Sequence, residues 1–552
     1  MRRISRLAGS CLFFWASSAL AQVPSGVQPG QIERSQQAPR EPSVPLNFPS
    51  PSSSNTPVDA APAGAENIRF VLRDLKVEGA TVYTAEALQS TYQGDIGKEI
   101  TLARVYGIAN ELTARYRNDG YILSQVIVLA QSVKDGVVTL RAVEGYVFNV
   151  NIQGSAGAPE QINAYTSAIK AVRPLTASAL ERYLLLINDI PGVAALATLS
   201  PSSEPGAADL TVSLEQRSYF ASFGLNNRNT RLIGPLRANL DVDFNGLTGA
   251  DRVGLRLLQT PANSELTLGS LLYDRVVSSG GLKVNLAYTQ LVSHPEATLA
   301  LPDLRSDSQS GSAGLTYPLL RSRLQNLNLR ATYSQHDGNT DASGAPLFRD
   351  HVRAARFGAS YDLVDGLRGI NLFDLEWSQG LSVSGATAEG DPLASRAGAT
   401  PTFQKVTFYA ARLQSLAPRW SLLAALSGQD SKNNLLSPEQ FAFGGADFGR
   451  GYDASDLTGD AGAAGKLELR YSGAGFGFVR DYTLYAFYDR GCIHNNSAAP
   501  ADDCADSSGL GARFSATHGI SGYVEYAKPV NHDIPAEGDR KSRVFAGLTV
   551  DF

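Results

Sequence analysis

The C-terminal part of this chain repeats one pattern, in which runs of about ten residues alternate between apolar and polar side chains and end at Gly, Asp, Asn or Ser. Successive side chains of a strand point to opposite faces, so each run presents one apolar and one polar face. The runs LKVNLAYTQ, LNLRATYSQ and the last strand, which ends at Phe552, follow this pattern. In the run LRANLDVDFNG the apolar face consists of Leu236, Ala238, Leu240, Val242 and Phe244.

Two architectures have strands with one apolar face. In a soluble sandwich the apolar face packs in a core, and in a transmembrane barrel it faces lipid. Tyr and Phe tend to stand at the ends of the runs, as in the aromatic girdles of membrane barrels. Because an open sheet edge in lipid would leave backbone groups unpaired, the strands are expected to close on themselves. Residues 217–552, at roughly 20 residues per strand with its turn, predict a transmembrane β-barrel of about 16 antiparallel strands.

Residues 1–21 have the composition of a secretory signal peptide. Arg2, Arg3 and Arg6 form a basic start, an apolar run follows, and Ala19-Leu20-Ala21 is a small-residue cleavage site. Beyond it, no apolar stretch reaches the roughly 18 residues that a membrane-spanning helix needs. These features predict a protein in the outer membrane of a Gram-negative bacterium, with the barrel in contact with lipid and the N-terminal domains in the periplasm.

Residues 22–66 are dominated by Pro, Ser, Gln and Ala, a composition that cannot bury enough apolar surface to fold alone. We interpret them as an extended linker. Within it, only PGQIERSQQAPREP has a helical composition. This segment is expected to form one short helix or to belong to a disordered spacer, and the sequence leaves both alternatives open.

Residues 67–146 and 147–216 are predicted to form two small α+β domains, each with the order strand, helix, helix, strand, strand. In the first, the segment RFVLRDLKVEG is expected to be one strand, Thr84 to cap a short helix, and residues 102–116 to form a second, amphipathic helix. In the second, a helix over residues 159–172 precedes another that carries leucines at helical spacing.

Charge and cysteine content limit the classes of partner. The formal net charge is −5 and no basic block occurs, so no nucleic acid is expected as a partner. Cys11 leaves with the signal peptide, and in an oxidising compartment Cys492 and Cys504 are expected to form one disulfide across a loop. The alternative, a metal site with His494, would need further ligands, and no metal is expected.

Two βααββ units ahead of a barrel with a terminal Phe resemble POTRA domains followed by the pore of the two-partner secretion translocators, the haemolysin secretion and activation family. Two motifs carry the resemblance. The segment LSPEQFAFGGADFGRGYDASDLTGDAG is similar to the long barrel loop that bears the family's Val-Arg-Gly-Tyr motif, with Gly449 in place of Val, followed by Arg450, Gly451 and Tyr452. The strand YTLYAFYDRG matches the family's Phe-x-Asp-x-Gly motif at Phe487, Asp489 and Gly491.

The alternation of that strand places Asp489 in the lumen independently of the resemblance, because Tyr482, Leu484, Ala486 and Tyr488 would face lipid. The resemblance implies that Arg450 and Asp489 form an ion pair inside the barrel and hold the loop in its working position. Gly451 would permit a tight turn and Gly491 would leave room for the loop. The alternative is that Arg450 lies on an exposed extracellular loop and Asp489 merely lines a wet pore.

The resemblance also implies partners. The POTRA pair would bind an unfolded secreted exoprotein, at a strand edge or beside a helix, and the barrel would work as a monomer. Phe552 would be the C-terminal signal that the barrel assembly machinery recognises. PGQIERSQQAPREP occupies the place of a pore-plugging N-terminal helix, which here would be short and broken by proline.

Three functions are compatible with the sequence. The first is translocation of a dedicated large exoprotein, of the haemolysin or adhesin type, by two-partner secretion. The second is assembly of outer-membrane proteins by a relative of the same superfamily, and the third is a passive porin-like channel. No His-Glu-x-x-His or Gly-x-Ser-x-Gly motif occurs, so we expect neither an enzyme nor a cofactor.

Overall fold

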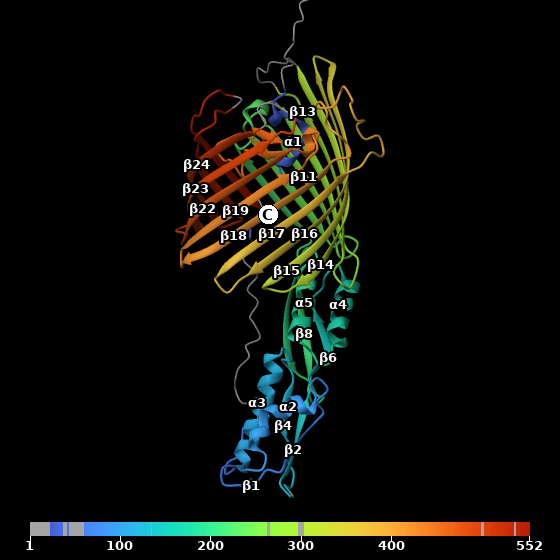
Figure 1. Cartoon of the computed structure of the whole chain (residues 1–552), viewed down its shortest axis with the longest axis vertical. Helices are drawn as coiled ribbons and strands as arrows, with labels where there is room; N and C mark the ends of the chain where they lie inside the picture. The colour runs from blue at the N-terminus through green and yellow to red at the C-terminus, as the bar shows by residue number, and fades with distance from the viewer. Residues whose placement is uncertain are drawn as a thin grey trace, which may run out of the picture.

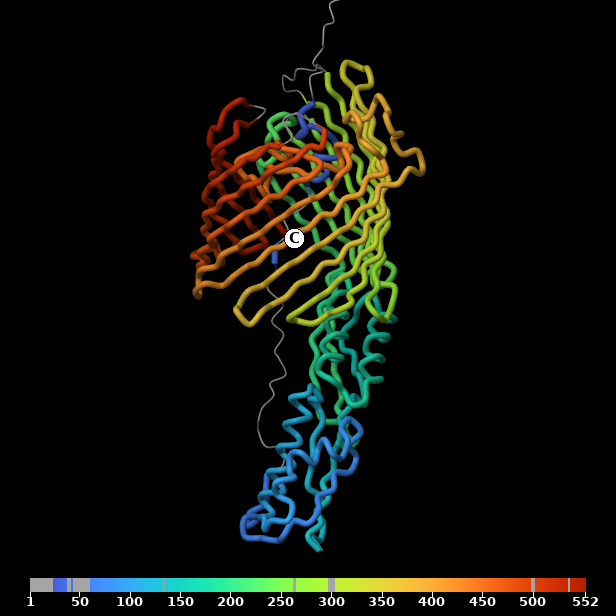
Figure 2. The backbone as a smooth tube through the Cα atoms, in the orientation of Figure 1, coloured from blue at the N-terminus to red at the C-terminus, as the bar shows by residue number. Residues whose placement is uncertain are grey.

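Three folded parts follow one another along the long axis of the molecule in the computed structural model (Figure 1). The structure describes residues 23–36, 41–42, 60–133, 135–261, 265–295, 303–497, 502–534 and 537–552. The barrel forms one end, a small α+β unit lies beneath it, and a second such unit forms the other end (Figures 1 and 2). The expected signal peptide over residues 1–21 lies outside the described residues.

The barrel is a closed sheet of sixteen antiparallel strands, which confirms the predicted fold class. Neighbouring strands are joined in chain order, and β26 pairs with β9 to close the ring. The strands are β9 (Tyr219–Asn226), β10 (Arg237–Asn245), β11 (Asp251–Gln259), β12 (Leu266–Val276), β13 (Lys283–Ser293), β14 (Leu304–Arg321), β15 (Gln325–Ala342), β16 (Ala345–Val364), β17 (Gly369–Gly380), β18 (Gln404–Ala417), β19 (Trp420–Asp430), β22 (Ala461–Ala474), β23 (Val479–His494), β24 (Asp502–Ala516), β25 (Ile520–Pro529) and β26 (Arg543–Asp551).

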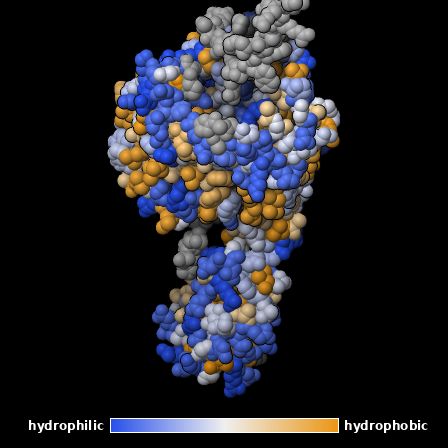
Figure 3. All heavy atoms as spheres, turned by 45° about the horizontal axis from the view of Figure 1, so that its top comes forward, coloured by the Kyte–Doolittle hydropathy of each residue, from blue (hydrophilic) through white to orange (hydrophobic). Residues whose placement is uncertain are grey.

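The alternation of side chains determines which face of the barrel wall is apolar. On β10, Leu240 and Phe244 are exposed on the outside, whereas Asp243 and Asn245 are buried on the inside. Figure 3 shows apolar residues gathered over the barrel wall, while the periplasmic end of the molecule is mainly hydrophilic on the face shown. The apolar face therefore contacts lipid and the lumen is polar, as expected of a membrane barrel.

The first α+β unit contains two helices packed on a three-stranded sheet of order β2-β5-β4. Thr84 and Thr101 accept hydrogen bonds from helical N–H groups and so define the starts of α2 and α3. The single strand expected over RFVLRDLKVEG is wrong, because the chain bends at the buried Leu72 and its two halves join different sheets. The elements are β1 (Arg69–Val71), β2 (Asp74–Glu78), α2 (Ala85–Tyr92), β3 (Glu99–Thr101), α3 (Leu102–Asn118), β4 (Gln125–Val128) and β5 (Val137–Val143).

The second α+β unit lies next to the barrel and is attached to its periplasmic turns. The Asp189 carboxylate accepts two hydrogen bonds from the Arg321 guanidinium, at 2.7 and 2.8 Å. Arg182 donates to the Pro318 carbonyl at 3.0 Å. The sheet has the order β6-β8-β7. The elements are β6 (Tyr146–Gln153), α4 (Pro159–Ala171), α5 (Ala177–Asn188), β7 (Val193–Pro201) and β8 (Ala207–Gln216).

The N-terminal segment of residues 23–36 lies inside the barrel, where it packs against β13, β14 and β15. It contains α1 (Pro29–Ser35), the short helix expected within PGQIERSQQAPREP. Val27 and Ile32 are buried against the lumenal wall. Residues 23–36 of the expected linker 22–66 are thus a lumenal element.

Two further features complete the fold. The Cys492–Cys504 disulfide joins directly paired positions on β23 and β24, with Cα atoms 4.1 Å apart, rather than crossing an unpaired loop. It therefore reinforces the wall at the extracellular end of this hairpin. Within the described part of the chain, no helix is both long and apolar enough to span a bilayer.

We expect the first α+β unit to lose stability on acidification through Glu144. Burial opposes ionisation of this carboxylate, but hydrogen bonds from Thr81, Val82 and Tyr116 outweigh it and hold its pKa below the usual value. A depressed folded-state pKa stabilises above the unfolded-state pKa of about 4.3, and this contribution is lost as the pH falls through the folded-state pKa.

Glu144→Gln should therefore destabilise the unit at pH 7 by about 1 kcal/mol, since the carboxylate is partly solvated, and should flatten the acid dependence. Hydrogen exchange of the α3 and β5 amides in the full chain, compared at pH 7 and at low pH, measures both effects. Equal acid sensitivity of variant and wild type would contradict the assignment to Glu144.

Candidate functional site

The connection between β19 and β22, residues 431–460, folds into the barrel and is called the lumenal loop below. It contains the 3-10 turn η4 (Ser437–Glu439) and a small hairpin of β20 (Phe441–Phe443) and β21 (Leu457–Gly459). Phe443, Arg450 and Tyr452 on this loop are buried. The alternative that Arg450 lies on an exposed extracellular loop is therefore wrong.

Arg450 is bound to Asp489 on β23 through three hydrogen bonds. Its Nε and Nη2 atoms donate to the Asp489 carboxylate at 3.0 and 2.7 Å, and its backbone N–H donates at 3.0 Å. The guanidinium also stacks over the Phe487 ring, 3.6 Å from the ring centroid. The structure thus brings together Arg450 with the Phe and Asp of the second motif, in the two-pronged geometry that Arg favours.

Further charges surround this pair and keep it balanced. The remaining Arg450 Nη1 donates to Glu468 on β22, which also receives Arg470 at 2.8 Å and Arg513 at 3.0 Å. The Glu525 carboxylate lies 3.9 Å from Arg450 and pairs with Arg228. A buried charge without a partner is costly, so this network holds the loop against the wall only as long as its members stay together.

The two glycines at the motif ends make room for one aromatic ring. A Cβ atom on Gly491 would lie 2.1 Å from the Phe443 ring, and one on Gly449 would lie 2.7 Å from it. Gly449 also has a φ of 78°, a conformation that a β-branched residue such as Val rarely adopts. Gly in place of the family's Val thus matches a local backbone that packs against Phe443.

The other two motif residues join the loop to β24 and to the end of β25. The turn is closed by the Tyr452 N–H, which donates to the Gly449 carbonyl at 2.9 Å. The Tyr452 hydroxyl donates to the Asp506 carbonyl at 2.9 Å. A Cβ atom on Gly451 would lie 2.9 Å from the Pro529 nitrogen, so Gly is needed here for close approach.

Glu439, near the start of the lumenal loop, is attached to another part of the wall. Its carboxylate pairs with Arg356 on β16 at 2.6 Å and with Lys405 on β18 at 2.7 Å. All three side chains are largely buried. The loop is therefore fixed to the wall by ion pairs at two places, through Glu439 and through Arg450.

The N-terminal segment binds directly to the lumenal loop. Gln31 donates to the Ser437 carbonyl at 2.6 Å, and Arg34 donates to the carbonyls of Pro438 and Gln440. A Cβ atom on Gly30 would lie 2.6 Å from Pro438, so the helix backbone is in close contact with the loop. Segment and loop together occupy the extracellular half of the lumen (Figure 2).

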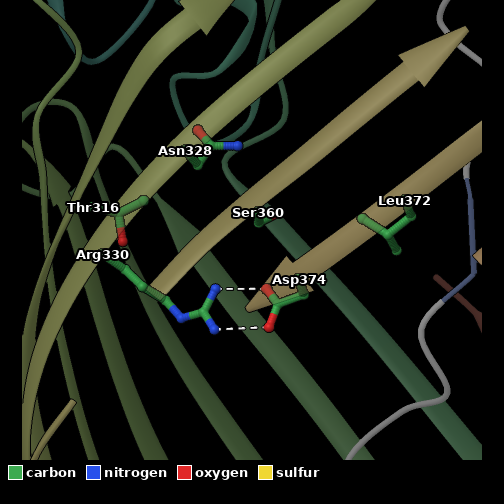
Figure 4. Close-up of a pocket in the computed structure, with 6 residues that line it drawn as sticks. All are labelled: Thr316, Asn328, Arg330, Ser360, Leu372 and Asp374. Atoms are coloured by element: carbon green, nitrogen blue, oxygen red, sulfur yellow. Dashed lines mark hydrogen bonds and ion pairs between the residues drawn. The ribbon is translucent and has the colours of Figure 1, made fainter. Parts of the chain in front are cut away.

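The lumenal wall away from the loop is lined by paired charges. Arg330 on β15 reaches across β16 to Asp374 on β17, with contacts of 2.6 and 2.8 Å, as Figure 4 shows. Arg256 on β11 pairs with Asp241 and Asp243 on the neighbouring β10. This part of the wall is strongly polar and its charges are locally neutralised.

Sequence reasoning missed Glu468, Glu525 and Phe443. The alternation of KLELRYS on β22 turns Glu468 inward, which was a usable signal. Its pairing with Arg450 depends on where the loop lies, which no local pattern reports. Among the described residues, no group of three or more His, Cys, Asp or Glu side chains could hold a metal ion.

Comparisons with known proteins agree with this architecture. A profile of the haemolysin secretion/activation protein family ShlB/FhaC/HecB matches residues 206–514, and a profile of the ShlB-type POTRA domain matches residues 70–145. The heme/hemopexin transporter protein HuxB of Haemophilus influenzae strain 86-028NP is 24% identical over 461 residues, covering 80% of each chain. The outer membrane transporter CdiB of Dickeya dadantii strain 3937 is 21% identical over 451 residues, covering 79% of each chain.

A solved structure shows the same fold. CdiB from Escherichia coli superimposes with a TM-score of 0.75 at 19% identity, covering 97% of this chain and all of that one. Barrel, lumenal loop and periplasmic POTRA region define an outer-membrane protein transporter. The chain belongs to the haemolysin secretion/activation protein family ShlB/FhaC/HecB, and it is a channel of two-partner secretion.

Arg450→Ala should leave the barrel folded and inserted but reduce protein export roughly tenfold or more, because Asp489 and Glu468 would lose a buried cation. Export is measured as the amount of secreted protein in the medium, and barrel folding as resistance to SDS before heating. Arg305→Ala, at an exposed ion pair on β14, is the control. Normal export by Arg450→Ala would show that the buried pair does not position the loop.

Gly491→Ala should displace the Phe443 ring and with it the lumenal loop, since the added Cβ has no space. We expect lower export and a larger mean conductance of the purified channel in a planar bilayer. Gly465→Ala on β22 is the matched control, because its Cβ would meet the end of the flexible Leu426 side chain at 3.1 Å and would lie at an ordinary 3.7 Å from the Ala425 carbonyl oxygen. Recovery in the double variant Gly491→Ala with Phe443→Ala would locate the effect at this contact, and no recovery would exclude it.

Proposed function

We propose that this channel threads one dedicated, large exoprotein of the haemolysin or adhesin type through its lumen as an extended chain. The observation that carries the proposal is the lumenal loop, which is held inside the barrel by buried ion pairs at Glu439 and at Arg450. A passive porin needs no such attachment. Ion pairs that exchange partners would let the loop shift while its charges stay compensated.

The periplasmic units would receive the exoprotein. In the second unit β6 and β7 are the edge strands of the sheet, and Ile152 and Leu196 on them are exposed. An edge strand has unpaired backbone groups to which an extended peptide can hydrogen-bond. An exposed apolar side chain on that strand can contact every second side chain of the bound peptide. The contacts of Asp189 with Arg321 hold this unit beside the periplasmic mouth of the barrel.

The lumen would then be a surface over which a chain of varied sequence slides. Because Arg330 and Arg256 are already paired with wall carboxylates, they have little tendency to bind a passing side chain. Folding of the exoprotein outside the cell would give the movement its direction. No catalytic residue, metal or cofactor is required by this mechanism.

Two further parts of the proposal concern the barrel itself. The terminal Phe552 has an exposed side chain, while its N–H donates to the Ala221 carbonyl at 2.8 Å. Its aromatic ring is thus available to the barrel assembly machinery as a C-terminal signal. A ring of sixteen paired strands needs no second copy to satisfy its edges, so the channel would work as a monomer.

The test is a comparison of the proteins in the culture medium and in the outer membrane, with and without this gene. Loss of one large protein from the medium, with other barrels unchanged, is the expected result. Depletion of many outer-membrane barrels would point to an assembly factor instead. No change in either fraction would leave a channel for small molecules and would overturn the proposal.

A further inference from the structure

A second buried ion pair lies three residues beyond Arg450, on the same turn of the lumenal loop. The Arg543 guanidinium, at the start of β26, donates to both oxygens of Asp453, at 2.7 and 3.1 Å. The side chains are 3% and 5% exposed, so the pair is as deeply buried as the one between Arg450 and Asp489. None of the motifs or charges that the sequence singled out includes it.

The position of Arg543 gives this pair a distinct role. β26 is the last strand and closes the barrel against β9 through five paired positions, whereas β9 makes eight such pairs with β10. Beyond the last of these five paired positions, the Asn227 side chain binds the backbone of β26. Its amide nitrogen donates to the Val544 carbonyl at 3.0 Å, and its amide oxygen accepts from the Ala546 N–H at 2.7 Å. Arg543 therefore stands where the backbone ladder of the seam has ended.

The ion pair continues across this seam. The Arg543 guanidinium also donates to Glu537, on the connection between β25 and β26, at 2.7 Å. Glu537 in turn pairs with Arg231, on the connection between β9 and β10, at 2.9 Å. A chain of alternating charges thus runs from the lumenal loop, through the last strand, to the hairpin that follows the first strand.

The N-terminal segment reaches the same place. The Ser25 hydroxyl donates to the Ser455 carbonyl, and a Cβ atom on Gly26 would lie 3.1 Å from the Ala454 carbonyl oxygen. Asp453 itself is therefore next to the part of the loop that the segment covers. Movement of the segment and movement of the loop both act on this point.

We propose that Asp453 and Arg543 are a second anchor of this turn of the lumenal loop, which sets the resting position of the turn by fastening it to the last strand at the barrel seam. Arg450 attaches the turn to β23, and Asp453 attaches it to β26. The turn then leaves its resting position only when both ion pairs break. Asp453 and Arg543 are positioning residues for transport, and this inference rests on the proposed function.

The test combines channel recordings with export. The purified full-length Asp453→Asn variant is recorded in a planar bilayer in KCl, and the time spent at high conductance is divided by the time spent at low conductance. This ratio should be roughly tenfold higher than that of the wild type. Asp453→Asn together with Arg450→Ala should exceed either single variant. Export by Asp453→Asn should fall while the barrel stays resistant to SDS.

Two variants separate positioning from folding. Arg543→Lys keeps the charge but not the two-pronged contact, so it should give an intermediate conductance ratio. The charge exchange of Asp453→Arg with Arg543→Asp should return the ratio toward that of the wild type. Lys541→Gln, which removes an exposed ion pair in the same connection, is the control and should match the wild type.

The outcomes are distinguishable. A wild-type ratio in Asp453→Asn and Arg543→Lys, with normal export, would overturn the second anchor and leave the proposed function standing. Should Asp453→Asn fail to fold, Arg543→Lys and the charge exchange decide, and failure of both to move or restore the ratio overturns the proposal. A wild-type chain that exports no protein would instead defeat the proposed function.

Discussion

The buried charge of Arg450 is the interaction on which the arrangement of the lumen depends. It is held by Asp489 and Glu468, and a third carboxylate, Glu525, lies nearby. Such a charge is stable away from water only when its partners come with it. The partners come from β22, β23 and β25, so each of these strands must carry an acidic residue that faces inward. The loop must in turn lie inside the lumen.

A second constraint acts from outside. Backbone groups in lipid must be paired, so the wall has to be a closed ring, and the alternation of every strand then assigns each side chain to lipid or to lumen. The ring also explains why the seam matters. Here the first and the last strand of the ring must find each other, and the short ladder between them is supplemented by side chains such as Asn227.

Much of this could be predicted because it is local. A period of two residues fixes the side on which Asp489 lies, whatever the rest of the barrel does, and Thr84 caps its helix by accepting a hydrogen bond from the Ala87 N–H. What depended on distant contacts could not be predicted. RFVLRDLKVEG has the sequence pattern of one strand, and only the burial of Leu72 in the domain core divides it into two. The disulfide was expected to close a loop because neither strand sequence alone gives the register between β23 and β24. The Asp453 and Arg543 pair joins residues 90 positions apart and carries no local signal.

The helix α1 has seven residues, fewer than a helix needs to persist in water by its own propensity. Its turns exist because the lumen supplies partners for its side chains and a flat contact at Gly30. The helix would therefore unfold when it undocks, and the segment would leave the lumen as an extended chain and not as a helix. Re-entry would then be a folding reaction on the surface of the loop, favoured by the high local concentration of a segment that belongs to the same chain. In the resting channel the N-terminal segment is thus bound by the lumenal loop and the wall in the way that a separate peptide ligand would be.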